Sequence, residues 1–301
     1  MESTLVLDAR AELGEGPVWD SSNGVLWWVD IIPGRVHRFD PESGEDRSFA
    51  VGQMVGAVAL EANGSMLVAA RSGLRRIGAP DLNRWIAHGD EAPRSSEHPL
   101  PTPLMPNVRF NDAKCDPAGR FWMGTMDLNA EPGQGSLYCF FPDGRIRVKK
   151  DGVTVSNGLA WDTRVGAMYY IDTATQSVSA FDYDVAMGTI DNERTVIEID
   201  PDQGAPDGMA IDSDGMLWIA LWGGSAVGRW NPETGEQLDS IAVDAPQVTS
   251  CMFGGPDHKT LYITTARVGL DAATLEAHPH AGGLFQADCD VVGIVPPAYA
   301  Q

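Results

Sequence analysis

Four residues with oxygen-bearing polar side chains occupy equivalent places in a repeating strand pattern. They are Glu15, Asn111, Asn157 and Asp207. Two charged and two neutral oxygen donors suit a hard divalent cation such as Ca²⁺, Mg²⁺ or Mn²⁺. Zn²⁺ would lack the His or Cys ligands that it favours. Without a cation, two carboxylates held close together would repel and one would be protonated. The alternative is that these residues only cap strand ends or hold water.

The equivalence of these positions rests on six short apolar runs, each of which follows a turn signal. The runs are Val25–Ile31, Ser65–Ala70, Phe121–Met126, Ala167–Asp172, Met216–Trp222 and Thr260–Ala266. Eleven positions before the residue that opens each strand core lies an anchor. The anchors are Glu15, Gly56, Asn111, Asn157, Asp207 and Ser250. No helical period of useful length separates the runs.

The spacing of the anchors predicts the fold. Successive anchors are 41, 55, 46, 50 and 43 residues apart, the length of a four-stranded propeller blade. We therefore expect an all-β, six-bladed β-propeller with four-stranded antiparallel blades around a central channel, as a single domain over residues 1–301. A strand near Leu5–Ala9 would complete the last blade. A β-sandwich does not explain six copies in one register.

Propeller geometry would bring the anchors together. The innermost strand of every blade lines the central channel, so equivalent positions form a ring around one axis. Oxygen donors far apart in the sequence would then lie within a few ångströms of one another.

Composition excludes several kinds of partner. The net charge is −21 and no basic patch is visible, which argues against binding to nucleic acid or anionic membranes. No apolar stretch has the length of a membrane span, and the first residues do not resemble a signal peptide. The four cysteines show no CxxC spacing and fall in predicted strands, where Cys acts as a small hydrophobe. We expect a reduced, cytoplasmic protein that is a monomer by default.

Five motifs follow one another along the chain. They are Leu13-Gly14-Glu15-Gly16-Pro17, Arg109-Phe110-Asn111-Asp112, Ser156-Asn157-Gly158-Leu159, Pro206-Asp207-Gly208-Met209 and Phe253-Gly254-Gly255-Pro256. In this order they resemble the senescence-marker-protein (regucalcin)/gluconolactonase family, and the resemblance runs from about Leu7 to Phe285. It implies a six-bladed propeller lactonase.

The resemblance also assigns roles to residues. It implies that Glu15, Asn157 and Asp207 bind one divalent cation, with Ca²⁺ expected first and Mg²⁺, Mn²⁺, Zn²⁺ or Fe²⁺ as alternatives. It implies that Arg109 and Asn111 contact substrate. Sugar-binding relatives carry an acidic residue where this chain has Asn129. The amide of Asn129 can still bind a hydroxyl, but the preferred sugar is left open.

These observations lead to a functional hypothesis. A cation would polarise the carbonyl of a sugar lactone, while Asp207 accepts a proton from the attacking water. The product would be the aldonic acid. The alternatives are a related propeller esterase or phosphotriesterase, and a cation-binding propeller without enzymatic activity. The chain has no Gly-x-Ser-x-Gly motif, which argues against a serine hydrolase.

The longest step between anchors contains the proline-rich stretch Gly89–Pro106. Long ordered loops in compact domains are often lids. We expect this stretch either to cover the mouth of the channel and help to select substrate, or to be a surface excursion without such a role.

Overall fold

Tight turns at glycine and Asx residues divide the chain into short antiparallel strands. The computed structural model describes residues 1–89, 91–98, 100 and 104–300. At the first hairpin of several repeats a glycine has positive φ, as at Gly64, Gly119 and Gly215, where a side chain would be strained. All six apolar runs form the second strand of their repeat, within a residue or two of the predicted bounds.

Four sheets have four strands each, joined in chain order. The first contains β2 (Gly14–Asp20), β3 (Val25–Asp30), β4 (Arg35–Asp40) and β5 (Glu45–Ala50). The second contains β6 (Val55–Leu60), β7 (Met66–Ala70), β8 (Gly73–Ile77) and β9 (Ser95–His98). The third contains β10 (Val108–Cys115), β11 (Phe121–Asp127), β12 (Gly135–Phe140) and β13 (Ile146–Val153). The fourth contains β14 (Ser156–Asp162), β15 (Ala167–Asp172), β16 (Ser177–Asp184) and β17 (Thr189–Glu198).

The remaining eight strands form one sheet that consists of two groups of four. One group contains β18 (Ala205–Ile211), β19 (Leu217–Trp222), β20 (Ala226–Trp230) and β21 (Gln237–Ala242). The other contains β22 (Gln247–Gly254), β23 (Thr260–Ala266), β24 (Leu284–Asp288) and β1 (Thr4–Leu7). A single residue pair, Trp222 with Gln247, joins β19 to β22. The N-terminal strand β1 pairs with β24, so the predicted closure of the last group by the start of the chain is confirmed.

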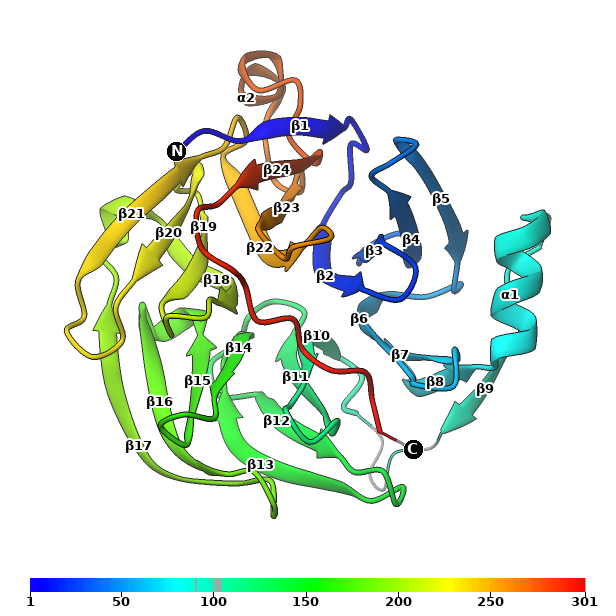
Figure 1. Cartoon of the computed structure of the whole chain (residues 1–301), viewed down its shortest axis with the longest axis horizontal. Coiled ribbons are helices and arrows are strands. Elements are labelled where there is room, and N and C mark those ends of the chain that lie inside the picture. The colour runs from blue at the N-terminus through cyan, green and yellow to red at the C-terminus, as the bar shows by residue number, and fades with distance from the viewer. Residues whose placement is uncertain (90, 99, 101–103, 301) are drawn as a thin grey trace.

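The first strand of each group lies closest to the central axis (Figure 1). Strands β2, β6, β10, β14, β18 and β22 each contact the next one, and β22 contacts β2. The groups therefore close into a ring of radiating sheets, which is the arrangement of a β-propeller. All six predicted anchors lie on these inner strands.

The expectation that no helical period of useful length separates the six apolar runs is wrong at one place. Helix α1 (Ala79–His88) connects β8 to β9 and lies outside the second sheet (Figure 1). It buries only Leu82 and Trp85, three residues apart, so its apolar stripe is too short to stand out in the sequence. The ring of Trp85 packs edge-on against Phe49 at a centroid distance of 4.9 Å. The shorter helix α2 (Ala272–Ala277) has no buried residue.

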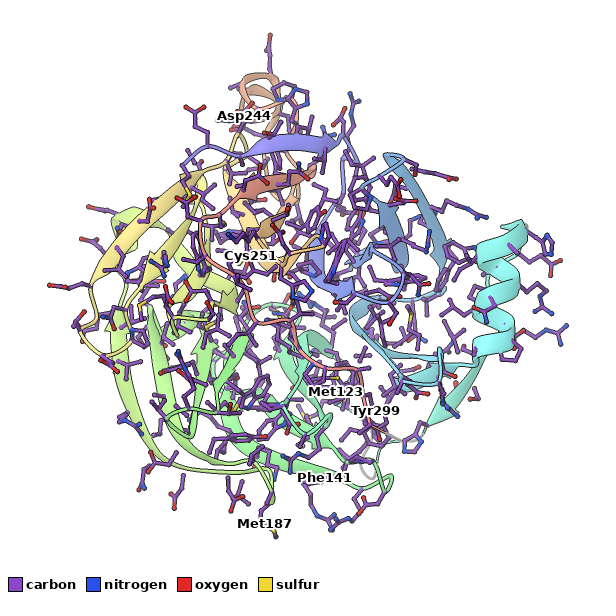
Figure 2. The ribbon with its side chains drawn as sticks, in the orientation of Figure 1. Met123, Phe141, Met187, Asp244, Cys251 and Tyr299 are labelled. Carbon is purple, nitrogen blue, oxygen red and sulfur yellow. The ribbon has the colours of Figure 1, made fainter. Side chains whose placement is uncertain are left out.

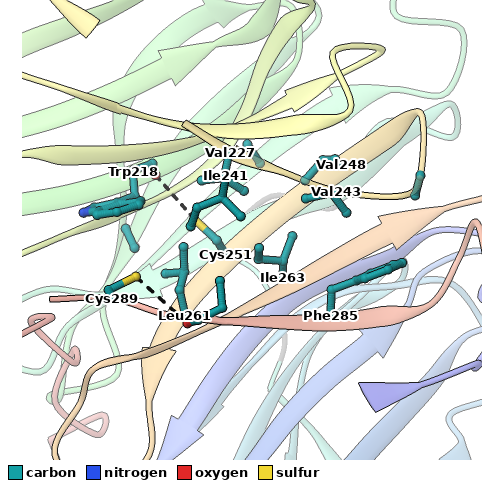
Figure 3. Packing of buried hydrophobic residues seen from close by; sticks show 14 of the residues in the cluster. Trp218, Val227, Ile241, Val243, Val248, Cys251, Leu261, Ile263, Phe285 and Cys289 are labelled. Carbon is teal, nitrogen blue, oxygen red and sulfur yellow. Dashed lines mark hydrogen bonds between the residues drawn. The ribbon is translucent and has the colours of Figure 1, made fainter. Parts of the chain in front are cut away.

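The apolar core lies between neighbouring sheets. In the cluster shared by β19–β23, the ring of Trp218 contacts the ring of Phe253 edge-on, and Cys251 lies among aliphatic side chains (Figure 3). All four cysteines are free and buried. Burial raises the pKa of the Cys251 thiol to about 12. This confirms that the cysteines act as small apolar residues.

After β24 the chain crosses the ring as a tail, residues 289–300 (Figure 1). Val292 O accepts from Ser213 N at 2.8 Å, and Tyr299 N donates to Leu60 O at 2.7 Å. The hydroxyl of Tyr299, labelled in Figure 2, donates to Phe141 O at 2.7 Å. The tail thus connects the fifth group of strands to the second and third across the axis.

Candidate functional site

The inner strands are irregular where the predicted site residues lie. The register between β2 and β3 shifts between Glu15 and Val18, and that between β10 and β11 shifts between Phe110 and Ala113. Strands β14 and β18 shift in the same way between Ser156 and Leu159 and between Pro206 and Met209, the intervals that contain Asn157 and Asp207. Such bulges redirect side chains away from strict alternation. The chain therefore departs from regular pairing at the positions that face the axis.

Glycines beside two of the site residues let the inner strands approach closely. A Cβ atom at Gly158 would lie 2.8 Å from Asp207 O, on the neighbouring strand. A Cβ atom at Gly208 would lie 2.5 Å from the Cβ of Ser250. Neither position has room for a side chain. The Asn-Gly and Asp-Gly pairs therefore let Asn157 and Asp207 occupy adjacent strands at close range.

Three buried carboxylates from different inner strands influence one another. Glu15, Asp112 and Asp207 are each at most 5% exposed. Among the described residues, Asp112 Oδ2 and Asp207 Oδ1 have no hydrogen-bond partner. Oε2 of Glu15 accepts a hydrogen bond from Gly16 N at 2.9 Å. The arrangement leaves buried oxygens open to a ligand, since buried polar atoms in folded proteins nearly always have partners.

Burial and mutual repulsion disfavour the charged forms of these carboxylates. Desolvation, followed by the negative charge of Asp112, raises the pKa of Glu15 to about 8. Desolvation and the nearby Glu15 raise the pKa of Asp207 well above its ordinary value. Desolvation likewise raises the pKa of Asp112. Either protons or a cation must therefore neutralise part of this charge near neutral pH.

Two cationic side chains lie within the same region. Desolvation lowers the pKa of the Arg109 guanidinium to about 10, although Glu15 and Asp207 oppose the shift. Burial also lowers the pKa of Lys114, whose ammonium donates to Met209 O. Three carboxylates against two cationic groups leave one negative charge uncompensated when all are ionised. A divalent cation would reverse the sign of that balance.

The two asparagines are hydrogen-bonded to each other. Asn111 Nδ2 donates to Ser156 O and to Asn157 Oδ1, both at 2.9 Å. Asn111 Oδ1 accepts from Arg109 Nη1 at 2.6 Å. On the far side, Asn157 Nδ2 donates to Thr173 Oγ1 at 2.7 Å. We call Glu15, Arg109, Asn111, Asp112, Asn157 and Asp207 the hub cluster.

The donor set of the hub cluster fits a hard cation. The described part of the chain contains no group of three His, Cys, Asp or Glu side chains that could hold a metal. A cation here would therefore need a neutral oxygen in addition to Glu15 and Asp207, and Asn157 Oδ1, which accepts one hydrogen bond from Asn111, has a second lone pair to supply it. Carboxylate and amide oxygens suit Ca²⁺, Mg²⁺ or Mn²⁺. The unpartnered Asp207 Oδ1 supports this fit.

Asn129 lies apart from the buried part of the hub cluster. It is exposed, and its backbone N–H donates to Asp127 Oδ1 at 2.7 Å in the turn after β11. The pairing of Val108 with Asp127 places this turn beside the start of β10. Asn129 is therefore near the end of the inner strand that carries Arg109. Its contact with substrate stays a prediction.

The proline-rich stretch divides into parts with different positions. Ser95–His98 forms β9, which pairs with β8 at the outer edge of the second sheet, so this part is not a cover over the channel (Figure 1). Residues 90, 99 and 101–103 lie outside the described residues. Asn107 O accepts from Leu128 N at 2.7 Å, which places the end of the stretch beside the Asn129 turn. A role of Leu104–Pro106 at the channel mouth stays a prediction.

Sequence reasoning missed three residues of this region. Asp112 follows an anchor directly, and strict alternation would turn it away from the axis; only its acidic type beside Asn111 hinted at a role. Lys114 lies on the same inner strand, but nothing in its spacing marked it. Thr173 belongs to the short 3-10 helix η1 (Thr173–Thr175) after β15, and no repeat position singles it out.

Two cavities lie at the opposite end of the channel, beneath the tail. Their volumes are about 480 Å³ and about 270 Å³. Both are lined by Lys114, Cys115, Met252, Pro296 and Pro297. Neither is lined by Glu15, Asn157 or Asp207. The hub cluster and these cavities therefore occupy different levels of the channel.

No helix in the described ranges is long and apolar enough to cross a membrane.

Comparisons with known proteins match nearly the whole chain. The family profile described as "SMP-30/Gluconolactonase/LRE-like region" matches residues 13–267. The chain is 41% identical over 300 residues to the Bacillus subtilis (strain 168) protein named "Putative sugar lactone lactonase YvrE", covering 100% of this chain and 99% of that protein. It is 37% identical to regucalcin of Xenopus laevis, over 98% of this chain and 97% of that protein.

A solved structure agrees with these matches. It is that of regucalcin from Agrobacterium tumefaciens strain C58, described as a calcium-binding protein. The TM-score is 0.90 at 28% sequence identity, covering 99% of this chain and 97% of that one.

Proposed function

The chain belongs to the SMP-30/gluconolactonase/LRE-like family, and from this membership and the hub cluster we propose that it hydrolyses a sugar aldonolactone with the help of one divalent cation. The relative from Bacillus subtilis is named for a sugar lactone, and the regucalcin of Agrobacterium tumefaciens is described as calcium-binding. Ca²⁺ is therefore the first candidate among the hard divalent cations.

We also propose that residues 1–301 form one six-bladed propeller domain. Six groups of four strands in the described part of the chain, closed by β1 against β24, support six blades. The contacts between successive inner strands support a single ring.

One observation carries the functional proposal. Glu15 and Asp207 are buried together with raised pKa values, and Asp207 Oδ1 has no hydrogen-bond partner among the described residues. Glu15, Asp207 and Asn157 would hold the cation, and a bound cation supplies polarisation of the lactone carbonyl. Without a compensating ligand, this burial of carboxylates would only destabilise the fold.

The side chains of the hub cluster have separate roles in the proposed reaction. Asp207 would hold the cation through one carboxylate oxygen and accept through the other a proton from the water that attacks the carbonyl carbon. The ring C–O bond then breaks, and the proton passes to the released alkoxide. Arg109 and Asn111 hold the hydroxyl groups of the sugar in a fixed orientation. The two side chains are themselves joined by the hydrogen bond from Arg109 Nη1 to Asn111 Oδ1 at 2.6 Å. Asn129 would contact a more distant hydroxyl at the rim.

A pH-stat assay on aldonolactones tests the proposal directly. Protein that has been treated with chelator and then loaded with a single metal should release acid from a gluconolactone, with Ca²⁺ compared against Mg²⁺, Mn²⁺, Zn²⁺ and Fe²⁺. Asp207→Ala should lower kcat by about 10²–10⁴-fold, the usual loss when a general base is removed. The control is Asp244→Ala, at an exposed carboxylate labelled in Figure 2.

Two further arms separate the alternatives. Aryl esters and phosphotriesters are assayed in the same way, and faster turnover of these substrates would favour the esterase or phosphotriesterase function. Binding of cation without turnover of any substrate would favour a non-enzymatic cation-binding propeller. An Asp207→Ala variant with full lactonase activity would refute the proposed role of Asp207.

A further inference from the structure

Thr173 connects two of the proposed cation ligands. Its hydroxyl oxygen accepts from Asn157 Nδ2 at 2.7 Å and donates to Pro206 O at 2.8 Å. Pro206 directly precedes Asp207 on β18, whereas Asn157 lies on β14. A single side chain outside the inner strands therefore links Asn157 on β14 to the residue that precedes Asp207 on β18.

The direction of these hydrogen bonds is fixed by chemistry. A backbone carbonyl such as Pro206 O only accepts, so the hydroxyl of Thr173 must use its one proton there. Its remaining lone pairs then accept, so the neighbouring amide must present its NH₂ group to Thr173. The carbonyl oxygen of Asn157 is left on the opposite side, toward Asn111. Thr173 thus decides which end of the amide faces the axis.

The backbone holds Thr173 firmly in this place. Its N–H donates to Val155 O at 3.0 Å, and its carbonyl accepts from Gln176 N at 3.1 Å. The preceding Asp172 accepts from the N–H groups of Thr154 and Val155, both at 2.9 Å. The hydroxyl is therefore presented from a rigid turn.

We propose that Thr173 is a positioning residue, which holds the amide of Asn157 with Oδ1 toward the cation. This inference rests on the proposed function, because it assigns Asn157 Oδ1 as a ligand. Thr173 itself contacts neither cation nor substrate. Groups that orient metal ligands in this way affect metal affinity by about 10–100-fold.

The test measures Ca²⁺ binding by isothermal titration calorimetry on chelator-treated protein. Thr173→Val keeps the shape but loses the hydroxyl, and we expect Kd to rise by about 10-fold or more. Thr173→Ala is a second variant with less steric demand. Thr173→Ser keeps the hydroxyl and should bind within about 3-fold of the wild type, since the hydrogen bonds can be retained.

A matched control lies in the same turn. The hydroxyl of Thr175 donates to Asp172 O at 2.8 Å and does not reach Asn157. Thr175→Val should therefore leave Kd for Ca²⁺ unchanged. An equal loss of affinity in Thr173→Val and Thr175→Val would show that the turn acts only as structure, and would overturn the inference.

A double variant separates orientation from general damage. In an Asn157→Asp background both side-chain oxygens can face the cation, so amide orientation no longer matters. Adding Thr173→Val to Asn157→Asp should then change Kd by less than about 3-fold, because the effect of an orienting group disappears with the group that it orients. The same 10-fold loss in both backgrounds would contradict the positioning role.

The outcomes also distinguish this inference from the proposed function. If Asn157→Ala abolishes Ca²⁺ binding while Thr173→Val binds like the wild type, the proposed function stands and the role of Thr173 is refuted. If the wild type binds none of the divalent cations tested, both are refuted.

Discussion

Buried carboxylates lie within the inner strands and in the turns that follow them, and the two sets have opposite surroundings. In the turn directly after β10, Asp116 is 0% exposed and accepts five hydrogen bonds, including those from Arg120 Nε at 2.6 Å, Trp122 Nε1 at 2.8 Å and Tyr183 OH at 2.7 Å. Within β10 itself, Asp112 Oδ2 has no partner among the described residues.

Strand β18 and the residue that follows it repeat this contrast. Asp212 receives bonds from Trp218 Nε1 at 2.9 Å and Arg229 Nε at 2.8 Å, and Asp207 Oδ1 receives none in the described part of the chain. We call Asp116 and Asp212 the turn carboxylates. Buried carboxylates therefore serve two purposes. Those whose oxygens accept several hydrogen bonds stabilise the repeat, and those with an unpartnered oxygen provide a binding site at a cost in stability.

Removal of a turn carboxylate should have the largest effect on stability. Asp116→Ala would leave Arg120, Trp122 Nε1 and Tyr183 OH without their shared acceptor, and the free energy of unfolding should fall by about 3–5 kcal/mol. Urea unfolding monitored by tryptophan fluorescence measures it. The control is Asp143→Ala, which breaks the exposed pair with Arg145 and should leave the unfolding midpoint nearly unchanged. A loss at Asp116 no larger than at Asp143 would break the comparison.

We call Glu15, Asp112 and Asp207 the axial carboxylates. They should make the stability of the protein depend on pH. The pKa of Glu15 is raised from 4.5 to about 8, so between these values the folded, cation-free protein binds more protons than the unfolded chain. Its free energy of unfolding should therefore fall by about 4 kcal/mol as the pH rises from 4.5 to 8. Melting temperatures across this range in chelator and in excess Ca²⁺ measure it, and Ca²⁺ should reverse the trend. A flat profile in chelator would contradict the raised pKa values.

Replacing one axial carboxylate with a neutral side chain should stabilise the cation-free protein. Glu15→Gln removes a carboxyl group that must take up a proton on folding at pH 7, so the free energy of unfolding in chelator should rise by about 3 kcal/mol. The same variant should lose most of the stabilisation that Ca²⁺ gives. Chemical unfolding with and without Ca²⁺ provides both values. Destabilisation in chelator would place Glu15 with the turn carboxylates instead.

The smallest effect is expected for a carboxylate at a strand end. Asp30 accepts from Glu12 N at 3.0 Å and from Leu13 N at 2.9 Å. Asp30→Asn keeps the shape but loses the charge-assisted bonds, and should cost about 1 kcal/mol of stability. Ca²⁺ affinity should not change. Weaker Ca²⁺ binding in this variant would mean that Asp30 belongs with the carboxylates that bind the cation.

Sequence reasoning located the inner strands because turn glycines and apolar runs repeat at blade length. The eleven-residue register identified Glu15, Asn157 and Asp207 as anchors, and the family resemblance assigned these three to the cation. Sequence reasoning missed Asp112 because the bulge between Phe110 and Ala113 depends on backbone geometry, which alternation does not reveal. Cation binding and the roles of Arg109, Asn111 and Asn129 stay predictions.

Local patterns also failed where function depends on contacts between distant residues. Thr173 meets Asn157 and Pro206 only because the turn after β15 folds over β18. Helix α1 escaped notice since it buries only Leu82 and Trp85. Periodicity detects a broad apolar face, and a stripe of two residues does not provide one.

The pairing of β1 with β24 determines when the ring can close during synthesis of the chain. Leu5 pairs with Phe285, so the ring cannot close until the ribosome has synthesised β24. Until β24 is available, β1 lacks its partner, and the unpaired edges of β1 and β23 are open to pairing with other chains. Closure of the ring is therefore a late step in folding.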